Sequence, residues 1–465
     1  MKKFAAITLT AALVASLAGC SSSGTPGTTA AEGGAKTTEA AKETKGNETQ
    51  GEQPSGKWDF SGITLNVAHS TTGDVSDAFD AQFAAFEELT GAKIEVEHLS
   101  SNADESENTL QVRAATGNLP DLWQTSIGAK LQNISPQDNI YDLSGQEWLS
   151  NIVDSYREIV TDKETGAVYV VPSTTSNVAG VFYNKKVYED MGLEIPETWE
   201  EFLANCEKIK TGSEIDPCAS PYNTPSGVQI LFLAQYYYVQ NENPDFAKQY
   251  TAKELELHES EAYMRGLTKM YDLWEKGYQC EDPLSLTFED ASVQLANGEA
   301  AMLVCRTNVM ATVEELAPEG IDNIGFFPLP DKDNKSLGVA TWMPPGWALN
   351  KNVPAEKEEC ALALMEFLTT GESIDAYCTK TTPTGAFMLN GVDLPDNVST
   401  AVIEAQSWVD KASSPVMEYF SDIKGSNMAT ILQLVGTGDY TPDQAITEIE
   451  QDNAIDAQQK GIAGW

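Results

Sequence analysis

The chain has 465 residues, of which 70 are Asp or Glu and 29 are Lys or Arg, and its formal net charge is −41 at pH 7. This charge repels phosphate backbones and anionic lipid headgroups, which argues against nucleic-acid binding and against membrane adhesion through basic patches. Beyond the N-terminal segment, roughly 400 residues are too many for one compact core and predict two α/β lobes of about 200 residues each.

The N-terminus has the pattern of a secretory signal peptide. Lys2 and Lys3 precede an apolar stretch over residues 4–17, and the sequence Leu-Ala-Gly-Cys ends at Cys20. Small residues at the cleavage point are typical of a removed leader, and the four residues resemble the lipobox of bacterial lipoproteins. We therefore expect residues 1–19 to be a signal peptide and Cys20 to carry the lipid that anchors an extracytoplasmic protein to the cell membrane.

Residues 20–57 have the composition of a tether. They are almost wholly Ser, Thr, Gly, Ala, Glu, Lys and Gln, without aromatic residues or apolar periodicity. Such a stretch buries too little apolar surface to offset its chain entropy, so we expect a disordered spacer between the lipid and the folded body.

Six further cysteines leave two alternatives open. An even number in an exported protein permits disulfides, whereas several of them lie among apolar residues as buried thiols would. They are Cys206, Cys218, Cys280, Cys305, Cys360 and Cys378. No Cys pair has metal-ligand spacing, and only His69, His98 and His258 offer imidazoles, so we expect neither a metal site nor a cofactor.

The body begins with a strand, helix, strand order. Apolar residues alternate over 63–67, recur at spacings of three and four over 75–89, and alternate again over 94–98. This rhythm predicts a parallel α/β sheet whose loops form a crevice at the strand ends. Thr198 with Glu201, and Thr441 with Gln444, form capping boxes that predict the starts of two further helices.

The order of segments along the body resembles the family 1 extracellular solute-binding proteins, the maltose-binding-like group that feeds carbohydrate importers. No single segment is specific, but together the matches run from about residue 60 to 450. The segments are Ala115–Asp121, Tyr169–Pro172, Phe182–Lys185, Pro196–Glu201, Asn297–Met302, Phe327–Pro330 and Ala363–Phe367.

The resemblance implies a two-lobed, type II periplasmic-binding-protein-like α/β fold, with the ligand cleft between lobes that are joined by several chain crossings. We expect crossings near Pro172, near Gly325 and after Gly371. The first lobe would then comprise 58–172 and 325–372, and the second 173–324 and 373–465. A ligand that contacts both lobes would stabilise the closed state, and closure would be the signal that the transporter reads.

Several ligand-binding residues are expected because they match family positions. Tyr222 falls in a segment that contributes a stacking tyrosine in the family, and aromatic rings suit the C–H faces of sugars. Other matches are expected to line the cleft with hydrogen-bonding groups. These are Thr71, Thr72 and Asp74 in the first loop, and Thr125 and Ser126 after the third strand.

One segment departs from the maltose binders. Residues 305–308 read Cys-Arg-Thr-Asn where those proteins place an aromatic residue, so a ligand other than maltose is expected. Trp342 is a candidate replacement ring, with packing as the equal alternative. Arg306 is a candidate for sugar hydroxyls or for a carboxylate, with a structural salt bridge as its alternative. Asn308 completes the expected set.

The function expected from these features is that of a monomeric substrate-binding lipoprotein of an ABC importer, which captures a sugar or oligosaccharide and delivers it to the permease subunits. One alternative keeps the fold but binds a polyamine, a peptide or a metal chelate. The other is an extracellular glycoside hydrolase, which needs two carboxylates about 5–10 Å apart. No carboxylate pair stands out among 70 acids, so we do not expect an enzyme.

Overall fold

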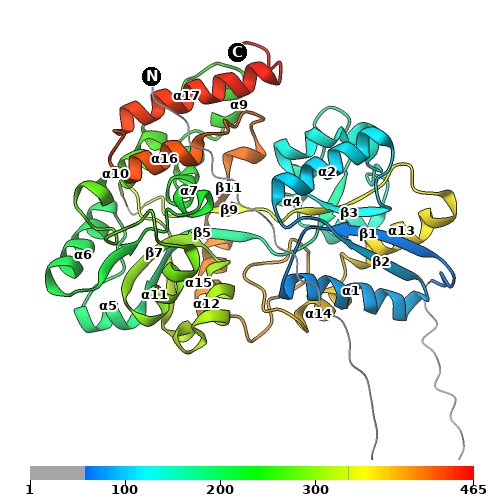
Figure 1. Cartoon of the computed structure of the whole chain (residues 1–465), viewed down its shortest axis with the longest axis horizontal. Coiled ribbons are helices and arrows are strands. Elements are labelled where there is room, and N and C mark those ends of the chain that lie inside the picture. Colours follow the sequence, from blue (N-terminus) through cyan, green and yellow to red (C-terminus); the bar gives the residue numbers. More distant parts are fainter. Residues whose placement is uncertain (1–57, 334) are drawn as a thin grey trace, which may run out of the picture. The chain divides into compact units, whose positions relative to one another are not determined.

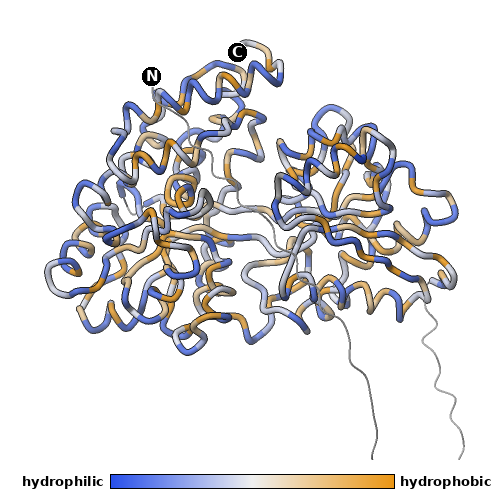
Figure 2. The backbone as a smooth tube through the Cα atoms, in the orientation of Figure 1, coloured by the Kyte–Doolittle hydropathy of each residue, from blue (hydrophilic) through white to orange (hydrophobic). Residues whose placement is uncertain are grey.

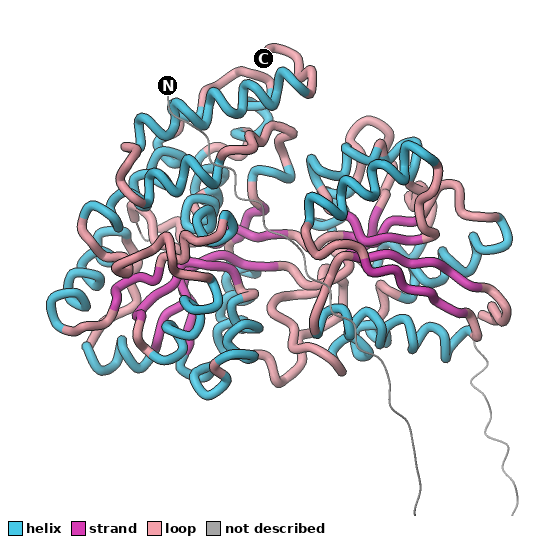
Figure 3. Tube along the Cα trace, viewed as in Figure 1, coloured by secondary structure: helices cyan, strands magenta, loops and turns pink. Residues whose placement is uncertain are grey.

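The computed structural model describes residues 58–333 and 335–465. The predicted signal peptide, the lipidation of Cys20 and the tether over 20–57 therefore lie outside the described residues. The described chain forms two β-sheets, each with helices packed against it (Figure 1; Figure 3). Within these residues, no helix is long and apolar enough to cross a membrane.

The first sheet has five strands in the order β2-β1-β3-β10-β4. β1 lies parallel to β2 and β3, whereas β10 runs antiparallel to β3 and β4. The strands are β1 (Thr64–His69), β2 (Lys93–His98), β3 (Leu122–Thr125), β4 (Val170–Pro172) and β10 (Gly346–Leu349). The helices of this lobe are α1 (Asp74–Thr90), α2 (Ala103–Thr116), η1 (Gly128–Ile134), α3 (Pro136–Asn139), η2 (Glu147–Asn151), α4 (Asp154–Val160), α13 (Ala355–Phe367) and α14 (Gly371–Cys378).

Helix α1 shows how the local pattern becomes structure. Phe79, Phe83 and Phe86 recur on one face and are all buried in the core of the first lobe. Gly91 ends the helix in the left-handed conformation, with φ at 74°, and its N–H donates to the Glu87 carbonyl at 2.8 Å. The predicted strand, helix, strand order of β1, α1 and β2 is confirmed.

The second sheet has six strands, five of them in the order β11-β9-β5-β7-β6. β8 and β9 pair with successive halves of β5, so they follow each other along one edge of that long strand. The strands are β5 (Asn177–Asn184), β6 (Asp216–Ala219), β7 (Ala300–Arg306), β8 (Ile324–Phe327), β9 (Val339–Trp342) and β11 (Ser413–Pro415). A Cβ at Gly180, between the two halves, would lie 2.4 Å from the Phe326 ring, so only glycine fits this position.

Helices cover both sides of the second sheet. Figure 1 shows α11, α12 and α15 on one side of the strands and α7, α10, α16 and α17 on the other. The helices are α5 (Lys185–Met191), α6 (Trp199–Gly212), α7 (Pro225–Ala234), α8 (Tyr236–Glu242), α9 (Phe246–Thr251), η3 (Leu257–Glu259), α10 (Glu261–Glu275), α11 (Phe288–Asn297), α12 (Val309–Leu316), η4 (Pro318–Asn323), α15 (Thr400–Lys411), η5 (Met417–Tyr419), α16 (Met428–Gly436) and α17 (Pro442–Gln459). Both predicted capping boxes, at the starts of α6 and α17, are confirmed. Figure 2 shows hydrophobic and hydrophilic residues alternating along the outer helices, as one-sided burial requires.

The chain crosses between the sheets at points that differ in part from the expected ones. The first crossing lies between Pro172 and Asn177. Near Gly325 there is no crossing, because β8 adds to the edge of β5 and β9 follows it there; the sheets put the second crossing between Trp342 and Gly346.

The third crossing also comes later in the chain than expected. α14 packs against α1, and residues 387–389 belong to the core of the first lobe, whereas Val398 belongs to the second. We therefore propose a division into 58–172 with 346–389 and 177–342 with 398–465. The expected boundaries at 325 and 372 were wrong, because the strand pairing and core packing that set the boundaries join residues far apart in the sequence.

A buried charge cluster ties α10 to the segment that follows β8. Asp331 and Lys269 are each only 2% exposed, and the Lys269 Nζ lies 3.0 Å from Asp331 Oδ1. Lys269 also donates to Gln235 Oε1 at 2.6 Å and to the Pro330 carbonyl at 2.5 Å. Arg265 donates to both Asp331 oxygens, so the carboxylate is enclosed by two cations.

The six cysteines in the described range are all free thiols. Cys206, Cys218, Cys305 and Cys360 are buried, and burial raises the pKa of each thiol. Of the two alternatives left open by the sequence, the structure therefore shows thiols without bridges.

Candidate functional site

The candidate site is a cavity of about 430 Å³ lined by residues of both lobes and of the crossing segments. This volume lies in the range of roughly 300–1,000 Å³ that small-ligand sites occupy. Most of the lining residues are serines or threonines, and Glu107 is the one charged residue among the described side chains that line it. The lining residues are Ser70, Thr71, Val75, Ser106, Glu107, Leu110, Gln124, Thr125, Ser126, Thr174, Thr175, Asn177, Asn308, Ala311, Pro345, Tyr377, Thr381, Thr382 and Thr384.

A chain of hydrogen bonds positions the first-lobe wall. The Thr71 hydroxyl, in the loop after β1, donates to Gln124 Oε1 on β3 at 2.8 Å. Gln124 Nε2 donates to the Ser173 hydroxyl at 3.1 Å, which in turn donates to the Pro345 carbonyl at 2.9 Å. The loop, the strand end and two crossing segments are thus held together, so the wall is preorganised for a ligand.

A carboxylate forms the far end of this wall. The Ser126 hydroxyl, just after β3, donates to Glu107 Oε1 on α2 at 2.7 Å, and Lys130 Nζ lies 3.1 Å from the same oxygen. Glu107 therefore carries a partner for its charge and still presents acceptor lone pairs at the cavity edge.

The second-lobe wall is built from the ends of two strands. Asn177 begins β5, and its Oδ1 accepts a hydrogen bond from the Thr307 hydroxyl at 3.4 Å. Asn308 lies directly before α12, and its side chain makes no hydrogen bond with the described residues. Both amides are half-buried and offer donors and acceptors to a ligand in the cavity.

The third part of the lining comes from α14 and the segment after it. Tyr377 and Thr381, Thr382 and Thr384 reach the cavity, and the Thr382 hydroxyl donates to Glu314 Oε1 on α12 at 3.2 Å. Burial raises the pKa of the Tyr377 hydroxyl, which therefore remains a neutral donor. Hydroxyls and amides make up most of the side chains that line the cavity, and they suit a ligand rich in hydroxyl groups.

The structure brings four of the predicted site residues to this cavity. They are Thr71, Thr125, Ser126 and Asn308. Thr72 and Asp74 are exposed and do not line it, because the loop after β1 turns so that only Ser70 and Thr71 face the cavity before α1 begins.

Tyr222 lies in the core of the second lobe, and this corrects its expected place in the cleft. Its ring packs over Gly436, where a Cβ would meet it at 2.3 Å, and Gln279 Nε2 donates to its hydroxyl at 2.9 Å. Burial raises the pKa of this hydroxyl. The packing of α16 against α7 covers the ring, and a single sequence segment gives no sign of that contact.

Trp342 and Arg306 form a pair beside the cavity. Trp342 ends β9 and is 8% exposed, which makes it a packing residue more than an open platform. The Arg306 guanidinium lies over the Trp342 ring, 5.6 Å from its centroid. Arg306 lines a smaller cavity of about 40 Å³, and Asn308 lines this cavity and the large one.

Sequence reasoning missed several lining residues. Gln124 and Asn177 lie at strand ends, and strand ends at a crossing are where ligands bind in such sheets. The second signal was the run of threonines over 379–384, because a cluster of hydroxyl groups can bind a polar ligand. Thr174 and Thr175 gave no local signal, because they reach the cavity only through the path of the chain at the first crossing.

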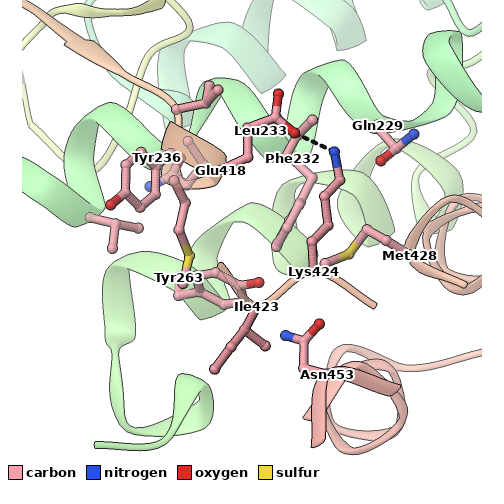
Figure 4. A pocket seen from close by; sticks show the side chains of 14 residues that line it. Gln229, Phe232, Leu233, Tyr236, Tyr263, Glu418, Ile423, Lys424, Met428 and Asn453 are labelled. Carbon is pink, nitrogen blue, oxygen red and sulfur yellow. Dashed lines mark hydrogen bonds and ion pairs between the residues drawn. The ribbon is translucent and has the colours of Figure 1, made fainter. Parts of the chain in front are cut away.

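A second cavity lies within the second lobe and has a different character (Figure 4). It measures about 60 Å³, well below the usual size of a ligand site. Phe232, Tyr236, Tyr263 and Met428 surround it, and the Lys424 ammonium pairs with the Glu418 carboxylate at its edge (Figure 4). We assign this cavity to imperfect core packing. No cluster of three metal-ligating side chains occurs among the described residues.

The fold and the cavity define a class of protein: a two-lobed solute-binding protein with a polar cavity where the chain crosses between the lobes. The comparisons give the family. Residues 81–405 match the family model described as bacterial extracellular solute-binding protein, and the chain belongs to that family. The family is extracellular, so the protein acts outside the cytoplasm, and the compared proteins are binding proteins rather than enzymes.

Two curated relatives bind sugars according to their names. The multiple sugar-binding protein of Streptococcus mutans is 24% identical over 280 residues, which cover 58% of this chain and 63% of that protein. The melibiose/raffinose/stachyose-binding protein of Bacillus subtilis is 29% identical over 153 residues, covering 33% and 34% of the two chains. This chain thus matches less than two thirds of the length of either relative.

Solved structures share the fold over nearly their whole length. A chitin oligosaccharide binding protein superimposes with a TM-score of 0.70 at 21% identity, covering 86% of this chain and 99% of that one. RafE from Streptococcus pneumoniae superimposes with a TM-score of 0.69 at 18% identity, covering 85% and 98%.

Proposed function

We propose that this protein is the substrate-binding component of an ABC importer and captures a sugar or oligosaccharide outside the cell. The observation that carries the proposal is the cavity lining: hydroxyls and amides from both lobes, with one charged side chain, Glu107, among the described residues. Polar groups of this kind match sugar hydroxyls, and the sugar-binding names of the relatives agree with that chemistry.

Capture would work by closure of the lobes. The crossing segments near 173–176, 343–345 and 390–397 are the places where a few backbone dihedrals can change while both cores stay intact. A ligand that bonds to Thr71 in one lobe and Asn308 in the other is held better in the closed form, so it shifts the equilibrium toward closure. The protein would act as a monomer, and its closed form would deliver the ligand to the permease subunits.

The proposed attachment is a lipid on Cys20 after removal of residues 1–19. The support is the sequence pattern and the extracellular family. Mass spectrometry of the protein from membranes of the producing cell should show an N-terminal diacylglyceryl cysteine. A mature protein that starts elsewhere, or one that is released unmodified from wild-type cells, contradicts this part of the proposal.

A thermal-shift screen tests the ligand class. Binding to the folded state alone stabilises it by RT ln(1 + [L]/Kd), about 2.7 kcal/mol at a ligand concentration of 100 Kd. We expect oligosaccharides to raise the melting temperature, and polyamines, peptides and metal chelates to leave it unchanged. A shift with one of the latter and none with sugars refutes the sugar assignment, and chromophore release from a panel of aryl glycosides refutes a purely binding role.

Two adjacent threonines provide a matched pair of variants for the same screen. Thr71→Val removes a hydroxyl from the cavity, whereas Thr72→Val removes one from an exposed position. We expect the first to weaken sugar binding by about 1 kcal/mol, the usual worth of one hydrogen bond, and the second to have no effect. Equal affinities for the two variants, measured by calorimetry, would contradict the placement of the site.

A further inference from the structure

Arg306 differs from the other arginines of this acidic protein. The chain has four, and three of them form ion pairs: Arg113 with Glu97, Arg157 with Asp154, and Arg265 with Asp331. Arg306 makes no ion pair and no side-chain hydrogen bond with any residue in 58–333 or 335–465. With 70 acids available, an arginine without a carboxylate partner is a feature that needs a physical reason.

The position of Arg306 keeps its charge partly away from water. It is the last residue of β7 and is half-buried, with its guanidinium over the Trp342 ring. Burial is the main cause that lowers the pKa of the guanidinium, and the group nevertheless remains charged at any physiological pH. Partial desolvation without a partner costs free energy, and a bound anion would recover that cost.

The acid whose charge acts on Arg306 is engaged elsewhere. Glu418, on η5, acts on Arg306 through its charge, but its carboxylate pairs with Lys424 (Figure 4). The neighbouring Tyr419 hydroxyl donates to the Met343 carbonyl at 3.2 Å and makes no hydrogen bond with the Arg306 side chain. The guanidinium therefore has unused donors, and a guanidinium presents five N–H groups in a planar fork that fits a carboxylate.

The small cavity at Arg306 shares one lining residue, Asn308, with the proposed sugar site. It measures about 40 Å³, more than the roughly 10–15 Å³ that one water needs, and Asn308 lines it together with the large cavity. Trp342 supports the guanidinium from behind, which fixes its plane by cation–π contact. A ligand in the large cavity could therefore place one substituent next to Arg306.

We propose that Arg306 binds the carboxylate of an acidic saccharide, so that the substrate class is an oligosaccharide with a uronic-acid-type residue. This inference rests on the proposed function and narrows it. The net charge of −41 does not oppose it, because screening at physiological salt limits the repulsion from surface charges beyond about 8 Å, whereas the guanidinium acts in direct contact.

The test compares acidic oligosaccharides with their carboxyl-reduced neutral forms. The probes are trigalacturonic acid and a glucuronic-acid-bearing xylooligosaccharide, each measured by calorimetry beside its reduced counterpart. We expect wild type to prefer at least one acidic probe by about 10- to 100-fold, as a bidentate charge-assisted pair allows. Arg306→Gln should lose that preference and retain the affinity for the neutral form within about threefold.

Two further variants serve as controls. Arg113→Gln makes the same charge change at a half-buried position of α2, where Arg113 pairs with Glu97, and should leave both affinities unchanged. Arg306→Lys keeps the charge but not the planar fork, so it should retain only part of the preference. If Arg306→Gln lowers the melting temperature without ligand, the substitution destabilises the fold. The preference of wild type for acidic probes and its partial loss in Arg306→Lys then test the carboxylate assignment.

The results separate this inference from the proposed function. Wild type that binds neutral and acidic probes equally, or Arg306→Gln that keeps the preference, overturns the carboxylate assignment and leaves sugar binding in place. A protein whose melting temperature no saccharide of either kind raises overturns the proposed function, and the inference fails with it.

Discussion

Replacing Asp331 by asparagine should remove the one carboxylate that two buried or half-buried cations share. The substitution keeps the shape of the side chain, but it presents an amide where Lys269 and Arg265 now meet a negative charge at 3.0 Å and 2.7 Å. Lys269 would keep two neutral acceptors, Gln235 Oε1 and the Pro330 carbonyl. Arg265 would keep its ion pair with Glu242 at 2.6 Å.

The expected cost follows from what remains. Removing one partner of a buried ion pair costs about 3–5 kcal/mol, because it leaves a charge without compensation. Since both cations retain some partners, we expect a loss of about 3 kcal/mol in the free energy of unfolding. The double variant Asp331→Asn with Lys269→Met also removes the stranded charge, and it should recover more than half of that loss.

The pH dependence provides a second check. Burial lowers the pKa of Lys269 to about 8, and Asp331 opposes that shift. Above this pH the folded wild type loses the Lys269 proton, and with it the attraction between the two groups. The deficit of Asp331→Asn should therefore be larger at pH 7 than at pH 9.

The assay is urea unfolding followed by tryptophan fluorescence, and Asp322→Asn, at an exposed position, provides a matched charge change with an expected effect within about 0.5 kcal/mol. A loss below 1 kcal/mol for Asp331→Asn, or a double variant no more stable than the single one, would refute the reasoning.

Three other predictions concern single positions. Between pH 7 and pH 5, His69→Phe should lose less unfolding free energy than wild type does. Burial lowers the His69 pKa in the folded protein, so on acidification the unfolded chain binds the His69 proton first and is favoured. A variant that loses as much unfolding free energy as wild type, measured by urea titration at both pH values, contradicts this. Gly180→Ala should lower the free energy of unfolding by about 1–3 kcal/mol, because the added Cβ clashes with the Phe326 ring on β8. Gly371→Ala has open space around it and should lower that free energy by less than about 1 kcal/mol. Equal melting temperatures for the two variants contradict this prediction. Among the six cysteines of the described residues, Cys280 and Cys378 should react with Ellman's reagent before the four buried thiols. Equal reaction of all six contradicts the burial.

Local pattern predicted the regular elements well. The phenylalanine spacing of α1, its glycine end, and the two capping boxes act within one or two helical turns, so neighbouring residues suffice to specify them. The family resemblance, rather than local pattern, singled out Thr71, Thr125, Ser126 and Asn308, and the structure places all four at the cavity lining.

Contacts between distant segments account for the errors. Tyr222 is covered because α16, more than 200 residues later, packs over its ring through Gly436. β8 pairs with β5 in the second sheet, and the absence of a side chain at Gly180 lets the Phe326 ring approach that strand. The chain therefore does not cross near Gly325, as expected, but after Trp342.

The sequence by itself determined the first strand, helix and strand of the body and the starts of two later helices, because periodicity and caps act on neighbours along the chain. Chain length and the family resemblance indicated the two-lobed α/β class. Only the tertiary structure decided which polar side chains share the cavity and which arginine lacks an acid. Those properties depend on distances between residues more than 300 positions apart, such as Thr71 and Thr384, and the folding of both lobes sets these distances.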